Sequence, residues 1–195
     1  TGIRDDGYRE ILGAKITDNE SEGFWTGFFD ELKDRGLKGV ELVVSDGHKG
    51  IQAAASSRFL GASWQMCQVH FSRAVMNNIP NRDKEAVAEK LRQGFEDPEK
   101  MKELAVYLRQ KKYSKSADTI DRFSQDIWNH RAFPKEHWKK IRTTNGLERI
   151  NKELKRRSRV VGAFPNDASL LRLGGAILMD INEEGLTGRK YLSMD

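Results

Sequence analysis

An acidic residue followed by a row of basic residues is the part of this sequence best suited to chemistry. Leu147, Ile150 and Leu154 recur at helical spacing and predict an amphipathic helix over residues 141–157. Glu148 lies near the start of that helix. The basic residues four, seven and eleven positions later share its face, and they are Lys152, Lys155 and Arg159. A carboxylate beside several cations would suit a metal ion that acts on a phosphate backbone.

Two structural interpretations compete with this one. Asn145 stands where an N-cap is expected, and Glu148 three residues later completes the pattern of a capping box, in which the glutamate only binds a backbone amide. Glu148 and Lys152 are also spaced like an ordinary ion pair on a solvated helix, which stabilises it by roughly 0.2–0.5 kcal/mol. Taken alone, the helix favours these structural interpretations.

The composition fits a protein that contacts nucleic acid. The 195 residues carry a net charge of +5 with a pI near 9.3, and basic residues crowd together between Lys135 and Arg159. Such a block is commonly a solvated face, and polyanion binding is its functional interpretation. The single cysteine, Cys67, excludes an intrachain disulfide framework and a multi-cysteine zinc site. No apolar stretch reaches the length of a membrane span, so we expect a cytoplasmic protein with no membrane partner.

Strand and helix patterns alternate over residues 1–80. A turn at Asp5-Asp6-Gly7 predicts a hairpin, and aromatic residues at 24, 25, 28 and 29 mark the buried face of a helix that ends at Gly36. The expected strands are residues 2–4, 8–16, 40–45 and 62–69, and further helices are expected at 49–60 and from 71. This order predicts an α/β fold with a mixed sheet flanked by helices.

Residues 81–140 lose strand character and predict an all-helical insertion. We expect helices at 83–95, 98–112 and 116–129. Trp128, Phe133 and Trp138 are expected to form the small core of this insertion, with stacking on a DNA base as the alternative. Residues 141–195 return to the main fold, with the Glu148 helix, a link at 160–166 and a final helix at 167–184.

Asp46 is the second candidate for chemistry. It follows an apolar strand, and α/β sheets commonly bind ligands at the carboxyl ends of their strands. An Asp-Gly pair after a strand is also ordinary turn chemistry, so Asp46-Gly47 alone does not decide between the two. With Glu148, Asp46 would supply two hard oxygen ligands, about half of a Mg²⁺ site.

Four short blocks along the chain together match a known family. They are, in order, Asp5-Asp6-Gly7-Tyr8-Arg9-Glu10-Ile11-Leu12-Gly13, Ser45-Asp46-Gly47-x-x-Gly50, Cys67-x-x-His70 and Arg142-Thr143-Thr144-Asn145-x-x-Glu148-Arg149-x-Asn151. The link Val160-Val161-Gly162-x-Phe164-Pro165-Asn166 and the helix after it match as well. In these blocks the sequence resembles the Mutator-type transposases of bacterial insertion sequences. Several blocks in a consistent order are far more specific than any one of them.

The resemblance implies an RNase H-like catalytic domain with an Asp-Asp-Glu (DDE) triad, interrupted by a helical insertion before the glutamate. Asp46 matches the second aspartate and Glu148 the glutamate. Two Mg²⁺ or Mn²⁺ ions would then cleave and join DNA phosphodiesters. Lys155 matches a basic position near the metals, and we expect Lys152, Arg156 and Arg159 to contact double-stranded DNA with it. A homo-oligomer assembled on transposon ends and target DNA is expected.

The sequence departs from the family at its start. The first aspartate of the triad lies upstream of the hairpin in the family and has no counterpart here, since Asp5 and Asp6 belong to the turn and Asp18 precedes a helix. The chain begins with Thr1 rather than Met, which indicates a piece of a longer protein without the opening strand. An inactive DNA-binding remnant of a transposase therefore remains an alternative. A helical protein-interaction module with a basic face is a third.

Cys67 and His70 have no clear role in the sequence. A Cys-x-x-His pair can begin a zinc site, but His130 and His137 are distant and seven residues apart. We expect a buried thiol and a hydrogen-bonded histidine at the end of a strand. His48, beside Asp46, is expected to be a solvated turn residue, with phosphate contact as the alternative.

Overall fold

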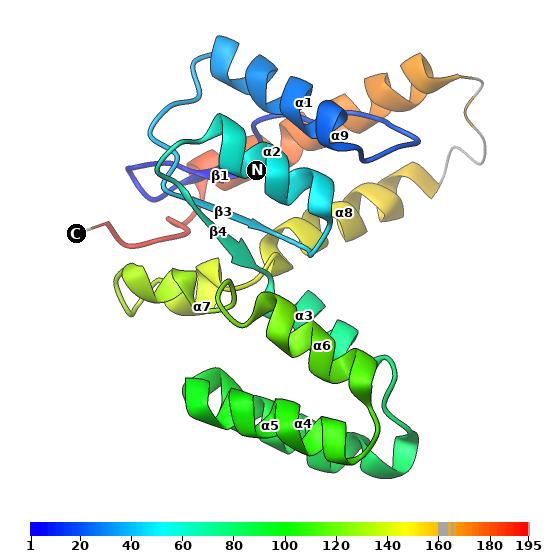
Figure 1. Ribbon diagram of the computed structural model, residues 1–195. Coiled ribbons are helices and arrows are strands. Elements are labelled where there is room, and N and C mark those ends of the chain that lie inside the picture. The colour runs from blue at the N-terminus through cyan, green and yellow to red at the C-terminus, as the bar shows by residue number, and fades with distance from the viewer. Residues whose placement is uncertain (160–163, 165, 195) are drawn as a thin grey trace.

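The computed structural model describes residues 1–159, 164 and 166–194 and shows a mixed α/β fold that is mostly helical (Figure 1). In the described residues the strands are β1 (Gly2–Ile3), β2 (Arg9–Glu10), β3 (Leu42–Ser45) and β4 (Ser63–Met66). The helices before residue 111 are α1 (Glu22–Asp34), α2 (Lys49–Arg58), α3 (Gln68–Met76), α4 (Asn81–Glu96) and α5 (Pro98–Gln110). They are followed by α6 (Ser114–Phe123), the 3₁₀ helix η1 (Asn129–Ala132), α7 (Trp138–Ile141), α8 (Asn145–Ser158) and α9 (Asp167–Thr187). The predicted link at 160–166 lies largely outside the described residues.

The strands form two small sheets within the described part of the chain, and not the one mixed sheet that the sequence predicts. β1 and β2 pair antiparallel, with Gly2 opposite Glu10, while β3 and β4 pair parallel, with Ser45 opposite Met66. The strand expected at residues 8–16 ends at Glu10, because the next amide, of Ile11, donates to Asn182 Oδ1 of α9 at 2.7 Å. The hairpin and the β3–α2–β4 unit are nevertheless where the sequence predicts them.

The main hydrophobic core joins the β3–β4 unit to the helices around it. Ser21 caps α1 by accepting the Phe24 amide at 3.2 Å, and Phe29 and Leu32 of this helix are buried. They belong to one cluster with Phe59, Trp64 and Phe71. The predicted aromatic face of the first helix is core in part: Phe29 is buried, Trp25 and Phe28 pack half-buried against the cluster, and Phe24 is not part of it.

The insertion shares this core. Its buried aliphatic residues, from α4, α5 and α6, belong to the same cluster as Phe29, although α4 and α5 lie farthest from the strands (Figure 1). The prediction that Trp128, Phe133 and Trp138 form a separate core of the insertion is wrong, because the helices of the insertion pack through the aliphatic residues of the main cluster. The third insertion helix ends at Phe123 and not near residue 129, and η1 and α7 follow it.

A second, smaller cluster joins α8 and α9. Ile150 packs with Ile177 and Ile181, and Ile11 from the segment after β2 lies against them. The C-terminal segment also returns to the first hairpin, where the amides of Tyr191 and Leu192 both donate to Gly7 O, at 2.8 and 3.0 Å. No described helix has the length and hydropathy needed to span a lipid bilayer.

Candidate active site

Asp46 is exposed at the first position after β3, in a turn that the hydrogen bonds of the preceding residue hold in place. Ser45 is buried, and its hydroxyl donates to Asp46 O at 2.8 Å while it accepts the indole N–H of Trp64 at 2.9 Å. The Asp46 carboxylate itself accepts the amide of His48 at 3.2 Å through Oδ1. The side chain is thus oriented by local hydrogen bonds and open to solvent.

Helix α6 of the insertion contacts the turn that carries Asp46. Arg122 of α6 donates to Gly47 O at 3.1 Å, and a Cβ atom on Gly47 would lie 2.6 Å from Cζ of Phe123. His48 accepts the Gly50 amide at 3.2 Å through Nδ1, so it caps α2. His48 is an exposed turn histidine, as expected, and the helix cap is a use that the sequence did not predict.

Glu148 lies in the first turn of α8 and faces α3. Its Oε1 is 3.5 Å from Arg73 Nη1 and 3.8 Å from His70 Nε2. The capping-box interpretation is wrong in its details, because Thr144 and not Asn145 stands at the N-cap of α8, and Thr144 makes no side-chain capping bond. Arg73, three residues beyond His70 on the same helix, was not recognised from the sequence.

Cys67 joins the two candidate segments. Its backbone amide donates to Ser45 O at 2.8 Å, and its buried Sγ accepts both the amide and the hydroxyl of Thr144 at 3.3 Å. The Thr144 hydroxyl also lies 3.4 Å from Nδ1 of His70. The residue before Asp46 and the residue one turn before Glu148 therefore contact the same cysteine. Cys67 is a buried thiol and His70 a hydrogen-bonded histidine, as the sequence predicts.

The basic face of α8 divides into free and paired cations. Lys152, Lys155 and Arg159 are exposed and have no ion-pair partner in the described part of the chain. Arg156 instead binds Glu153 through two hydrogen bonds, of 2.8 and 2.6 Å. Arg156, and then Arg157, lower the pKa of the Glu153 carboxyl to about 2. Arg156 is thus less available to an external anion than Lys152, Lys155 and Arg159.

The other histidines have partners of their own. The His130 amide donates to Gln65 Oε1 at 2.9 Å, and Nδ1 lies 3.2 Å from the same oxygen. Burial, followed by the charges of Arg131 and Arg142, lowers the pKa of His130 to about 4. His137 Nε2 contacts Ser193 O. Over the described ranges, no group of three or more His, Cys, Asp or Glu side chains is arranged to hold a metal ion.

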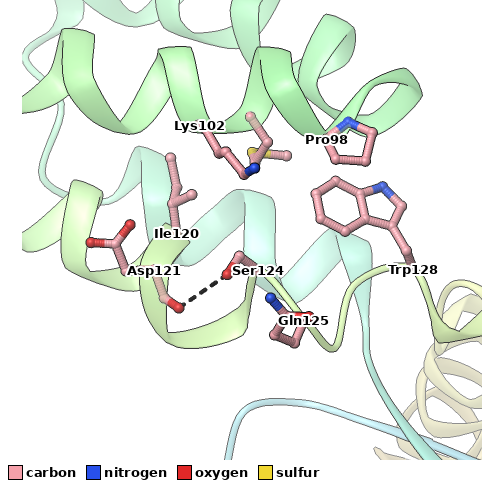
Figure 2. Close-up of a pocket in the computed structure, with 8 residues that line it drawn as sticks. Pro98, Lys102, Ile120, Asp121, Ser124, Gln125 and Trp128 are labelled. Atoms are coloured by element: carbon pink, nitrogen blue, oxygen red, sulfur yellow. Dashed lines mark hydrogen bonds between the residues drawn. The ribbon is translucent and has the colours of Figure 1, made fainter.

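Trp128 lines a pocket of about 350 Å³ in the insertion. Figure 2 shows Trp128 beside Pro98 at one end and Ile120 with Asp121 at the other. The charged rim is already neutralised, because Lys102 pairs with Glu99 at 2.7 Å and Asp121 pairs with Arg109. The Trp128 indole N–H donates to Phe95 O at 3.4 Å. Trp128 packs half-buried against the main core, and base stacking, the alternative to a core role, stays untested.

Comparison with known proteins decides the family. The family described as "Transposase, Mutator family" matches residues 1–187. The chain belongs to this family. It is 39% identical over 202 residues to the transposase for insertion sequence element IS256 in transposon Tn4001 of Staphylococcus aureus, covering 100% of the chain and 52% of that protein.

Two further relatives agree. The IS1081 transposase of Mycobacterium tuberculosis is 38% identical over 200 residues, which cover 100% of the chain and 48% of the relative. The ISRM5 transposase of Rhizobium meliloti is 36% identical over 199 residues, which cover 100% and 50%. The chain of this Mutator-family protein therefore spans about half the length of the curated relatives it matches.

Proposed function

We propose that this chain is the larger part of a DDE transposase catalytic domain of RNase H-like type, which cleaves and joins DNA during transposition of an insertion sequence. Asp46 and Glu148 are two of the three triad carboxylates, and the first aspartate is not in this chain. The observation that carries the proposal is the meeting of their segments at Cys67, from a sequence separation of 148 − 46 = 102 residues. Family membership supports it.

The donor set fits divalent metal chemistry. Asp46 and Glu148 offer hard carboxylate oxygens, the ligands that Mg²⁺ and Mn²⁺ prefer. Arg73 Nη1 lies 3.5 Å from Glu148 Oε1, and a metal ion bound at this carboxylate would take the place of that cation. When bound together, two such ions activate the attacking oxygen and stabilise the leaving oxygen of a phosphodiester. Asp46 and Glu148 would hold them.

The rest of the site would bind and orient double-stranded DNA. Lys152, Lys155 and Arg159 present free charges on the face of α8 that carries Glu148, where they would neutralise backbone phosphates. Contacts of this kind fix the position of the duplex without reading its sequence. We infer that the working protein acts in the cytoplasm as a homo-oligomer on transposon ends and target, since strand transfer must bring separate DNA segments together.

The test uses the full-length transposase that contains this chain, in Mg²⁺ or Mn²⁺, on a DNA substrate with its transposon ends. Asp46→Asn and Glu148→Gln should each abolish cleavage with little change in thermal unfolding, because each swap keeps the shape and removes the charge. Asp18→Asn is the matched control and should cleave normally, since Asp18 is exposed and is not one of the proposed triad carboxylates.

Two outcomes would contradict the proposal. Cleavage that survives Asp46→Asn or Glu148→Gln would show that the triad is misassigned. DNA binding without any metal-dependent cleavage by the full-length protein would favour an inactive remnant. The 195-residue chain alone should bind DNA and not cleave it, because it lacks one triad ligand.

A further inference from the structure

We propose that Thr144, acting through Cys67 and His70, is a positioning residue that sets Glu148 relative to Asp46. This inference rests on the proposed function, because it assigns a role within the same site. It gives a role to the Cys67-x-x-His70 pair. In the described residues this pair does not belong to any group of side chains that could hold a metal ion. The three side chains form one connected contact network between α3 and the start of α8.

Thr144 stands at the N-cap of α8 but does not cap that helix with its side chain. A threonine at an N-cap normally accepts an amide of its own helix, which stabilises the helix by about 1 kcal/mol. Thr144 occupies the N-cap of α8 and makes no such bond. Its hydroxyl instead meets Cys67 Sγ at 3.3 Å and His70 Nδ1 at 3.4 Å. Local preferences are given up in this way at functional sites, where position counts for more than helix stability.

Thr144 and its partner His70 both contact Glu148. Thr144 O accepts the Glu148 amide at 2.9 Å, which is the first i→i−4 hydrogen bond of the helix and ties the two backbones together. The His70 ring that contacts Thr144 through Nδ1 also places Nε2 at 3.8 Å from Glu148 Oε1. A shift of Thr144 would therefore move the backbone of Glu148 and the ring beside its carboxylate together.

Cys67, which binds Thr144, also contacts the residue before Asp46. Cys67 is completely buried, with 0% of its surface exposed, so its position is fixed by the core. Its amide donates to Ser45 O at 2.8 Å, and Asp46 is the next residue. One rigid residue thus holds the last residue of β3 through its backbone and the start of α8 through its sulfur.

The experiment compares Thr144→Val with Thr144→Ser in the full-length transposase. Valine keeps the shape of the side chain and removes the hydroxyl. The value of kcat for strand cleavage should then fall about 10- to 100-fold, because a misplacement of a catalytic group by about 1 Å can slow a reaction by about 100-fold. KM for DNA and the melting temperature should stay near wild type, and Mn²⁺ binding measured by electron paramagnetic resonance should weaken. Serine restores the hydroxyl and should recover kcat to within about twofold.

Thr143→Val is the matched control, because Thr143 is the neighbouring half-buried threonine and its hydroxyl makes no hydrogen bond in the described structure. It should leave kcat unchanged. Wild-type kcat and Mn²⁺ binding in Thr144→Val, or a Thr144→Ser variant as slow as the valine, would overturn the inference. Asp46→Asn in the same assay separates the two hypotheses: if it abolishes cleavage while Thr144→Val does not slow it, only the positioning role is lost.

A double-mutant cycle keeps the test decisive if Thr144→Val also lowers stability. Cys67→Ser retains an acceptor on a smaller atom and should slow cleavage by itself. Because both substitutions act on one contact, the double variant Cys67→Ser with Thr144→Val should be no slower than the worse single variant. Losses that multiply would show that the residues act independently and would contradict the proposal.

Discussion

Adjacent basic residues on α8 have different electrostatic surroundings, which makes them a matched pair for DNA binding. Lys155 is exposed without an ion-pair partner in the described residues, while Arg156 is held by Glu153 at 2.6 Å. A free cation that meets a phosphate releases about one counterion.

We therefore expect Lys155→Ala to reduce the slope of log affinity against log salt by about one unit and to weaken unrelated duplexes equally. Arg156→Ala should change the slope less, because Arg156 already has a carboxylate partner. Salt titrations of short duplexes with the three proteins measure both effects. Equal slopes for wild type and Lys155→Ala would remove Lys155 from the DNA path and leave Asp46 and Glu148 untouched.

His130 makes stability depend on pH. Its pKa is about 4 in the folded protein, against an ordinary value of 6.5, because it is buried with 2% of its surface exposed and lies near Arg131 and Arg142. The unfolded chain binds the proton first as pH falls, so the stabilisation is complete above about pH 6.5 and is lost progressively towards pH 4. The loss amounts to at most about 3 kcal/mol.

The measurement is the free energy of unfolding in urea at several pH values for wild type and His130→Gln. The free energy of unfolding of the wild type minus that of His130→Gln should fall as pH is lowered from about 6.5 to 4, because only the wild type loses the contribution of His130. Parallel curves for wild type and His130→Gln would contradict the prediction.

Residues with a local pattern were predictable, and residues defined by tertiary contact were not. The blocks around Asp46 and Glu148 could be recognised because their neighbours in sequence define them. Arg73 could not, because only the packing of α3 against α8 brings it within 3.5 Å of Glu148. The pairing of Glu153 with Arg156 follows from their i,i+3 spacing, although the dense basic block around them offers Glu153 several other possible partners.

At the scale of elements, helices were predicted better than strands. The boundaries of α1, α5 and α9 agree with their caps at Ser21, Asp97 and Asn166, which are local signals. A strand needs a partner, so the apolar pattern at residues 8–16 could not reveal that only Arg9 and Glu10 find one. The third insertion helix was overextended because residues 124–128 keep helical propensity but turn away to place Ile127 and Trp128 against the core.

The contact of α6 with the Asp46 turn is testable through Gly47. A Cβ atom there would stand 2.6 Å from the buried ring of Phe123, so Gly47→Ala should destabilise the fold by about 1–3 kcal/mol. Gly27→Ala makes the same change in the middle of α1, where nothing lies within 4 Å, and should stabilise by about 0.5–1 kcal/mol. Denaturant unfolding compares them. If Gly47→Ala leaves the free energy of unfolding unchanged, α6 does not pack tightly against the Asp46 turn.

At the scale of the whole molecule, the first hairpin and the last segment close on each other. Gly7 has a φ of +86°, and a Cβ on it would lie 2.1 Å from Leu192 O. Sequence pattern indicated the Asp5-Asp6-Gly7 turn but could not show what it faces, because the partner is about 185 residues away along the chain.

Gly7→Ala should therefore cost more than backbone strain alone. Gly36 has a φ of +102° with nothing within 4 Å, so Gly36→Ala measures the strain by itself, about 1–2 kcal/mol. The excess loss of Gly7→Ala in urea unfolding reports the contact with Leu192. If both variants lose the same free energy, the C-terminal segment contributes nothing measurable at that point.

The division of the interior into two clusters also bears on the order in which the chain matures on the ribosome. All members of the larger cluster lie between Leu12 and Trp128, whereas Ile11 must wait for Ile177 and Ile181. That is a delay of 177 − 11 = 166 residues, or about 10–30 s at ordinary rates of protein synthesis. The Asp46 turn and α6 can therefore be folded while the helix of Glu148 still lacks its packing partner. We therefore expect the proposed active site to be completed only after α9 has left the exit tunnel.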